Sequence, residues 1–253
     1  MCLIFLAFKN HPAYKLIVAA NRDEFYERQT EAAHYWKDKP DVLAGRDLVA
    51  GGTWMGMTAK GKLALLTNYR DPKNIDPHAP SRGLLVSDYL TGRDRPEHYL
   101  HAIADGEKEY NGFNIIVGGL NELWYYSNYS HVIEELIPGF YGLSNHLLDT
   151  PWPKVVRGKE KLKSILDQPA IQPEQLLDVL YDQTLAPEDK LPDTGLSLER
   201  EKALSSMFIK TPNYGTRCTT VVLVDYDNEV TFCERVYNTA TFEHSTGTFR
   251  FKV

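Results

Sequence analysis

A cysteine stands directly after Met1 in this 253-residue chain and opens the apolar segment Cys2–Phe8. A methionine aminopeptidase removes an initiator methionine readily when the next side chain is small, and its action here would give Cys2 both a thiol and a free α-amine. The reference pKa values of these groups are about 8.5 and about 8, so each can exchange a proton with the other near neutral pH. Such a residue can act as a nucleophile that carries its own base. The alternative is an ordinary buried thiol in a first strand.

A second apolar segment, Lys15–Ala20, follows Cys2–Phe8 after a polar loop that contains a proline. This pattern predicts a β-hairpin. If the pairing starts at Tyr14, Cys2 lies opposite Ala20. The residues that come next in the chain should then emerge beside the thiol.

Those residues are Asn21, Arg22, Asp23 and Glu24. Alternation along a strand puts Arg22 on the face of Cys2, and Asp23 reaches that face only if the strand bends or ends. A guanidinium beside a thiol favours the thiolate, and either carboxylate could orient the α-amine. The alternative is a solvated strand end with an incidental ion pair.

Asparagines end two further predicted strands. Asn68 precedes Tyr69 at the end of one apolar segment, and Asn145 ends a short strand over 142–145. The side chain of Asn donates hydrogen bonds and can help to form an oxyanion hole. Asn is also a frequent turn residue, which is the plainer interpretation of each.

Two other residues are candidates for contact with a ligand. Trp54 follows the turn Gly51-Gly52 and could form a wall of a substrate site, or it could belong to the core of a hairpin. Arg217 precedes the strongest predicted strand, 219–225. It could hold a carboxylate, tune the nucleophile or make a structural ion pair.

Composition excludes several classes of function. The net charge is −6 and the isoelectric point is about 5.8, so no overall basic field would attract nucleic acid. Three cysteines do not make a disulfide framework, and a reducing, cytoplasmic location is expected. The apolar amino terminus is too short for stable membrane insertion. Motifs for dinucleotide, phosphate or zinc binding are missing, so neither a cofactor nor a metal site is predicted.

The elements that must position these residues indicate an α+β fold. Strands are predicted at both ends of the chain, and helices are predicted between them at 81–90, 96–108, 153–165 and 173–184. Residues 186–203 are expected to form an exposed loop, and residues 205–209 a strand. No Pro/Gly-rich linker divides the chain, so residues 1–253 are expected to form a single domain.

Several motifs in this order resemble the NRDE family, which is named for residues like those at 21–24. The segments that carry the resemblance are Met1-Cys2, Asn21-Arg22-Asp23-Glu24, Thr67-Asn68-Tyr69-Arg70, Ser81-Arg82-Gly83, Gly142-Leu143-Ser144-Asn145, Pro151-Trp152-Pro153-Lys154 and Tyr214-Gly215-Thr216-Arg217. The family in turn is similar to N-terminal nucleophile (Ntn) hydrolases of the bile-salt hydrolase and penicillin V acylase type. This implies an αββα four-layer sandwich of mainly antiparallel sheets.

The resemblance also implies site residues and a function. Cys2, Arg22, Asp23, Asn68 and Asn145 would be catalytic, and the substrate would lie against Asn21, Glu24, Trp54, Tyr69 and Arg217. The hydrolases carry Arg-Asn-x-Asp where this chain has residues 21–24, so the acid that faces the amine is either Asp23 or Glu24.

Two functions follow as expectations. One is an amidohydrolase that acts on a small, linear, non-peptide amide or acyl substrate. The alternative is a binding or trafficking protein that holds haem, acyl-CoA or a lipid in the same cavity, with iron ligated by Cys2 or a histidine. The sequence leaves the oligomeric state open.

Overall fold

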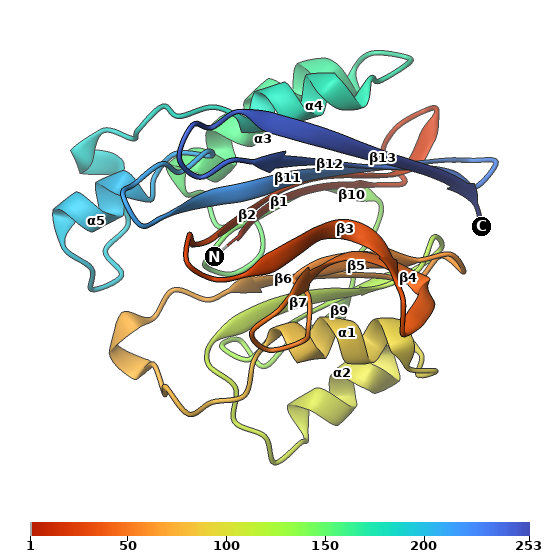
Figure 1. Ribbon diagram of the computed structural model, residues 1–253, viewed down its shortest axis with the longest axis horizontal. Helices are drawn as coiled ribbons and strands as arrows, with labels where there is room; N and C mark the ends of the chain where they lie inside the picture. Colours follow the sequence, from red (N-terminus) through yellow and green to blue (C-terminus); the bar gives the residue numbers. More distant parts are fainter. Residues whose placement is uncertain (1) are drawn as a thin grey trace.

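The computed structural model describes residues 2–253 and contains two antiparallel β-sheets with helices on their outer faces (Figure 1). The strands are β1 Cys2–Phe8, β2 Tyr14–Phe25, β3 Thr30–Trp36, β4 Lys39–Asp47, β5 Met55–Thr58, β6 Leu63–Asn68, β7 Phe113–Gly118, β8 Leu123–Ser127, β9 Ile133–Glu135, β10 Gly139–Leu143, β11 Tyr214–Asp225, β12 Glu229–Tyr237 and β13 His244–Lys252. The α-helices are α1 Gly83–Thr91, α2 Pro96–Ala104, α3 Pro153–Leu166, α4 Pro173–Leu180 and α5 Leu198–Ala203, and two short 3₁₀ helices span Pro72–Asn74 and Glu188–Lys190.

The first sheet combines strands from both ends of the chain with one from its middle, and the second is built from residues 30–135. The first has six strands in the order β10-β1-β2-β11-β12-β13, and the second has seven in the order β3-β4-β5-β6-β7-β8-β9. The long β2 therefore lies between the amino-terminal strand β1 and the carboxy-terminal strand β11. This arrangement brings residues from the start, middle and end of the sequence to one edge of the first sheet.

The two sheets pack face to face on a shared apolar core. Alternate residues of β1, such as Ile4 and Leu6, meet Leu63 and Leu65 of β6 in this core. The opposite face of the first sheet packs on α3 and α4, and the outer face of the second packs on α1 and α2. Because β1 is buried on both faces, its sequence is apolar throughout. The predicted αββα four-layer sandwich is confirmed, and Figure 1 shows its four layers in section.

Three local expectations were wrong. The hairpin register places Cys2 opposite Arg22, two residues beyond the expected Ala20, because Phe8 pairs with Leu16 instead of Tyr14. Residues 186–203 include α5, whose buried face anchors the segment. Residues 205–209 are buried without forming a strand. In each case tertiary contacts override the local pattern.

None of the helices within residues 2–253 has the length and apolar character that crossing a bilayer would require.

Candidate functional site

A row of neighbouring residues crosses the first sheet at the start of β1. Cys2 pairs with Arg22 of β2, and Arg22 pairs in turn with Cys218 of β11. The side chains of Cys2 and Arg22 share the face that carries Ile4, Ala20 and the other residues of the core between the sheets, since side chains alternate along a strand. The thiol therefore points into the space between the two sheets.

Asn145 lies in the bend that follows β10, the other neighbour of β1. The pairing of β1 with β10 ends at Ile4 and Leu143, two residues short of Cys2 and of Asn145. The backbone carbonyl of Asn145 accepts a 2.8 Å hydrogen bond from the Arg70 N–H. Cys2 thus has a guanidinium opposite it on β2, and Asn145 follows the strand on its other side.

Burial affects the pKa of the Cys2 thiol more than the neighbouring guanidinium does. Desolvation raises the pKa of the thiol above its usual value, Asp23 and Glu24 add to this rise, and Arg22 opposes it. The expectation that Arg22 makes Cys2 a standing thiolate is therefore corrected. A thiol in this setting needs a base to accept its proton as it attacks.

Asp23 is the carboxylate that is better placed to act with Cys2. Its side chain is buried, and Oδ1 accepts a hydrogen bond of 2.7 Å from the Thr216 hydroxyl. Desolvation raises the pKa of Asp23, against the lowering effect of Lys154 and Arg70. Among the charged side chains, Asp23 is the one that perturbs the pKa of Cys2 most.

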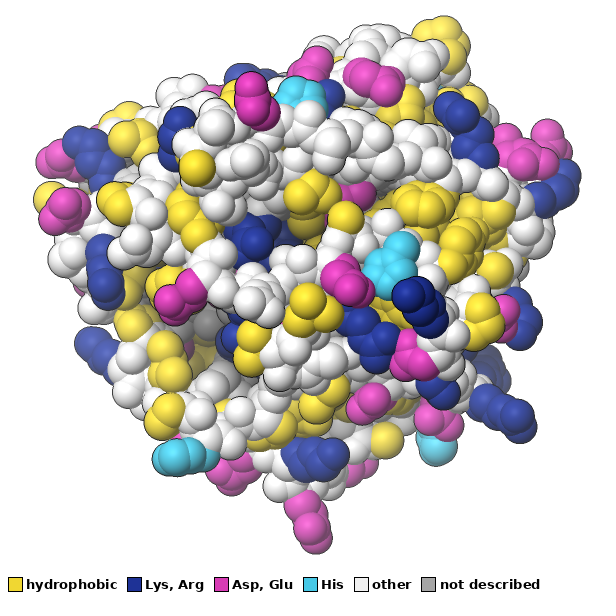
Figure 2. Space-filling view, in the orientation of Figure 1, with side chains coloured by type: hydrophobic (Ala, Val, Ile, Leu, Met, Phe, Trp, Pro, Cys, Tyr) yellow, Lys and Arg dark blue, Asp and Glu magenta, His cyan; other side chains and the backbone are white. Residues whose placement is uncertain are grey.

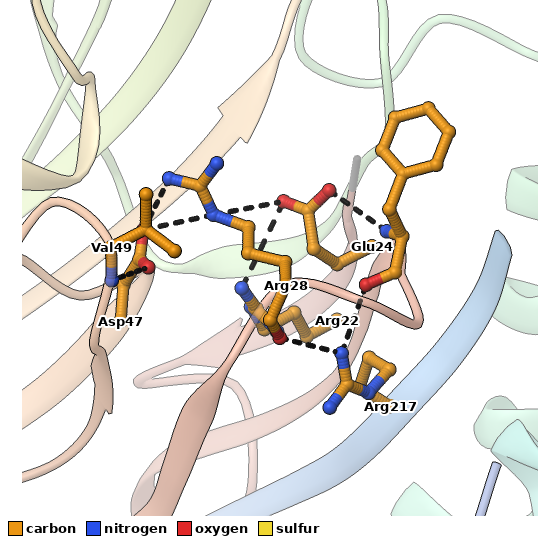
Figure 3. A network of polar contacts seen from close by, with 7 residues as sticks. Arg22, Glu24, Arg28, Asp47, Val49 and Arg217 are labelled. Carbon is orange, nitrogen blue, oxygen red and sulfur yellow. Dashed lines mark hydrogen bonds and ion pairs between the residues drawn. The ribbon is translucent and has the colours of Figure 1, made fainter.

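Glu24 belongs to a different set of contacts, which Figure 3 shows. Its carboxylate lies 3.8 Å from the Arg22 guanidinium and 3.9 Å from that of Arg28, and it accepts a hydrogen bond from the backbone N–H of Phe25. Glu24 thus fixes the position of Arg22 and of the turn after β2. A substrate contact for Glu24 remains a prediction.

Arg217 fastens the same turn. Its Nη1 donates 2.9 Å hydrogen bonds to the carbonyls of Phe25 and Arg28 (Figure 3). The guanidinium is half-buried, and desolvation lowers its pKa with a further contribution from Arg22. These contacts favour the structural interpretation of Arg217 over a substrate contact, which stays untested.

The two predicted oxyanion residues meet, but through different atoms. Asn145 Nδ2 donates a 3.0 Å hydrogen bond to the backbone carbonyl of Asn68. Alternation along β6 puts the Asn68 side chain on the face of Ala64 and Leu66, which pack toward α1 and α2. The Asn68 backbone therefore positions the side chain of Asn145. An oxyanion role for the second amide hydrogen of Asn145 stays a prediction.

The predicted substrate contact of Asn21 is corrected to a structural role. Its Nδ2 donates to the carbonyls of Leu180 and Met207, at 3.0 and 2.8 Å, and its Oδ1 accepts from the Thr219 hydroxyl at 2.6 Å. Asn21 also pairs with Leu3, whose side chain packs on the helices. It consequently points away from the thiol.

Two aromatic residues border the site. The Arg22 guanidinium lies over the Trp54 ring at 4.2 Å from its centroid, a cation–π contact that holds the arginine on the face of Cys2. Tyr69 stacks on Tyr129 with ring centroids 3.7 Å apart. Substrate contacts for Trp54 and Tyr69 stay predictions.

Sequence reasoning assigned no role to a second group of buried polar residues, namely Arg70, Lys154, Glu201 and Tyr214. Arg70 and Glu201 form a buried ion pair with a separation of 2.6 Å. The charge of Lys154 lowers the pKa of Asp23, and the charge of the Cys2 thiolate raises the pKa of Lys154. Three of these residues stand in or beside motifs already singled out, and that position was the available signal.

Within residues 2–253 no group of three or more His, Cys, Asp or Glu side chains is close enough to hold a metal ion.

Comparison with solved structures shows which known proteins share this fold. The chain superposes on the Caenorhabditis elegans N-acylethanolamine-hydrolyzing acid amidase ortholog with a TM-score of 0.51 and 13% identity, covering 88% of this chain and 92% of the other. It superposes on the C2A mutant of conjugated bile acid hydrolase from Clostridium perfringens with a TM-score of 0.54 and 9% identity, covering 99% and 97%. At these identities the likeness shows an Ntn-hydrolase-like fold.

Comparison of sequences shows the family. The Mus musculus protein named Transport and Golgi organization 2 homolog is 38% identical over 99% of each chain. The Drosophila melanogaster protein named Transport and Golgi organization protein 2 is 33% identical over 92% of this chain and 91% of its own. Residues 1–239 match the family described as Transport and Golgi organisation 2. The chain therefore belongs to the Transport and Golgi organisation 2 family, and it carries that family's sequence on an Ntn-hydrolase-like fold.

Proposed function

We propose that this protein is a cysteine N-terminal nucleophile amidohydrolase that acts on a small, linear, non-peptide amide. The observation that carries the proposal is the placement of Cys2 at the start of β1, with Arg22 opposite it on β2 and Asn145 just after the neighbouring strand β10. The fold shared with hydrolases is consistent with this role but does not establish it. Loss of Met1 is required, because it frees the α-amine.

The first step is attack by the thiol on the amide carbonyl. The α-amine of Cys2 takes the proton from Sγ as sulfur bonds to the carbonyl carbon, and the carbonyl π electrons move to oxygen. Asn145 Nδ2 is the donor we assign to the resulting oxyanion. A single donor of this kind was worth about 10²- to 10³-fold in rate in a well-studied protease.

The second step releases the amine product and then the acid. The protonated α-amine gives its proton to the leaving nitrogen as the carbon–nitrogen bond breaks, which leaves a thioester on Cys2. Water then attacks the thioester with the α-amine again as base, and the carboxylic acid departs as the thiol re-forms. The α-amine thus serves first as base and then as acid in each half of the cycle.

Asp23 and Arg22 support these steps from behind the thiol. Asp23 is buried, and the charge of its carboxylate raises the pKa of the Cys2 thiol. The carboxylate is therefore suited to hold and orient the α-amine. Arg22 is 5% exposed, and it carries a positive charge on the strand that pairs with Cys2. It would stabilise the negative charge that develops on sulfur during attack.

The test has two parts. Intact mass of the purified protein should show loss of Met1, and incubation with activated acyl esters should add the acyl mass to a peptide that contains Cys2. Cys233→Ala, which alters a buried thiol on β12, is the matched control and should acylate normally. Retention of Met1 by the active protein, or acylation that persists in Cys2→Ala, would overturn the proposal.

A further inference from the structure

Buried hydrogen-bond donors without acceptors lie close to the proposed nucleophile. Within residues 2–253, Arg70 Nε and Nη2, Lys154 Nζ and the Tyr214 hydroxyl have no hydrogen-bond partner, although each atom is inaccessible to solvent. Lys154 is 3% exposed and Arg70 is 8% exposed. Leaving such groups unpaired destabilises the folded state, and charged groups do so more than neutral ones. Their presence in one place therefore needs a physical reason.

Backbone and ring contacts bring Arg70 and Lys154 together. The Arg70 N–H donates a 2.8 Å hydrogen bond to the Asn145 carbonyl. The Arg70 guanidinium lies 4.7 Å from the ring centroid of Trp152, which caps α3 two residues before Lys154. The positive charge of Arg70 lowers the pKa of Lys154, after the larger effect of desolvation.

The same group of donors reaches the catalytic residues. Tyr214 begins β11, and burial raises its pKa with further contributions from Asp23, Glu24 and Cys2. Lys154 interacts with the charges of both Asp23 and Cys2. Tyr214 pairs with Phe25, two positions beyond Asp23 on β2. The donors thus lie within electrostatic reach of the thiol, where the end of β6, the start of α3 and the start of β11 approach one another.

The surface is open near this point. On the face shown in Figure 2, the molecule is hollowed close to where Figure 1 marks the amino-terminal end of the chain, and basic side chains are visible inside the hollow. The acidic groups nearby are already engaged: Glu201 binds Arg70 and the hydroxyl of Thr194, and Asp23 binds Thr216. A bound ligand with acceptor oxygens would supply the partners that these donors lack.

We propose that Lys154, Arg70 and Tyr214 form a subsite for an anionic group of the substrate, separate from the reacting carbonyl. The substrate of Cys2 is then an amide that also carries a carboxylate, sulfonate or phosphate. Two or three oxygens on one atom would accept the hydrogen bonds that now lack partners, and the charges of Lys154 and Arg70 would strengthen them. The claim about substrate rests on the proposed function, whereas anion binding itself does not.

The experiment measures binding and turnover separately. Calorimetric titration of Cys2→Ala, which cannot acylate residue 2, compares N-octanoylglycine with N-octanoylglycinamide, a pair that differs by one carboxylate. A second pair, suberic acid monoamide and its methyl ester, places the carboxylate on the acyl side. Inorganic phosphate is titrated as a probe without an acyl chain. In at least one of the two pairs, we expect the anion to bind at least about tenfold more tightly than its neutral partner.

Two variants locate the subsite. Tyr214→Phe removes a hydroxyl without a partner and should leave the free energy of unfolding nearly unchanged, while Lys154→Met removes the buried cation. Each is combined with Cys2→Ala and should lose about tenfold or more of the affinity for the anion but not for the neutral compound. Tyr237→Phe, which breaks a hydrogen bond to Thr219, and Lys159→Met, on the same helix as Lys154, are the matched controls and should keep the preference.

The outcomes separate the two proposals. Anion preference in the Cys2→Ala background without turnover of either amide by the wild type would uphold the subsite and overturn the hydrolase proposal. Turnover of neutral and anionic amides at equal kcat/KM, with equal binding, would uphold the hydrolase and overturn the subsite. Failure of phosphate and of both carboxylates to bind, or equal losses in the variants and their controls, would also overturn the subsite.

Discussion

The Arg70 guanidinium and the Glu201 carboxylate form an ion pair of 2.6 Å in the interior, although 131 positions separate them in the sequence. Glu201 lies on α5, in a segment expected to be an exposed loop, and its other oxygen accepts hydrogen bonds from the backbone and hydroxyl of Thr194. The pair fastens this segment to the strand end that carries Asn68. It thereby ties a distant part of the chain to the candidate site.

Glu201→Ala should destabilise the protein by about 3–5 kcal/mol, because it leaves the buried Arg70 cation without its partner. Urea unfolding followed by circular dichroism measures the change. Glu188→Ala is the control, since Glu188 makes an exposed ion pair with Lys202, and it should change the free energy of unfolding little. Equal effects of the two substitutions would show that Arg70 does not depend on Glu201.

Cys2 should react slowly with thiol reagents at pH 7, and its rate should rise only above the usual pKa of a thiol. Burial raises the pKa of Cys2, so the reactive thiolate is scarce near neutral pH. The measurement uses a small methanethiosulfonate on the Cys218→Ser/Cys233→Ser variant, which keeps Cys2 as its one thiol. A pH profile with its midpoint below the usual thiol value would contradict the dominance of desolvation.

Asn145→Ala should lower kcat by about 10²- to 10³-fold with a small change in KM, as expected for a donor that acts mainly on the transition state. Asn68→Ala should have a much smaller effect, because the Asn68 backbone carbonyl, which the substitution retains, is the group that holds Asn145. Steady-state kinetics on one amide substrate compares the two. A larger loss in Asn68→Ala would return the oxyanion role to the Asn68 side chain.

Lys154 should make stability depend on pH in alkaline solution. Desolvation lowers its pKa from 10.5 to about 8 in the folded protein, so between these values the unfolded chain binds more protons and the folded state gains stability as pH rises. Relative to Lys154→Met, the wild type should gain about 3 kcal/mol of unfolding free energy from pH 7 to pH 10.5. Parallel urea titrations at several pH values measure this difference. A constant difference would mean that Lys154 titrates normally.

Cys2→Ala should distinguish the hydrolase from the carrier expected as its alternative. Loss of a nucleophile abolishes turnover of acyl amides and leaves the affinity for acyl ligands largely intact. Loss of an iron-ligating thiolate would instead weaken haem binding and shift the Soret band. Amide hydrolysis and haem titration on the same preparations decide between them, and we expect the first pattern. Absence of turnover together with weakened haem affinity would favour the carrier.

The sequence by itself determined the fold class and the fact that Arg22 lies on the same face of the sheet as the nucleophile Cys2. Apolar segments such as Cys2–Phe8 and 219–224 are buried on both sides in the observed sandwich, so their composition alone indicated packed sheets. The two-residue error in the hairpin register left Arg22 on the face of Cys2, because side chains repeat with a period of two. Local periodicity was sufficient for both results.

Only the tertiary structure decided how the polar residues of the site are used. Asn21 turned out to bind backbone carbonyls near α4, and burial reversed the expected direction of the Cys2 pKa. Lys154 and Glu201 stand in segments whose local sequence looks exposed, yet both are buried. Desolvation and pairing depend on neighbours that are more than a hundred positions away in the chain, and no local pattern contains that information.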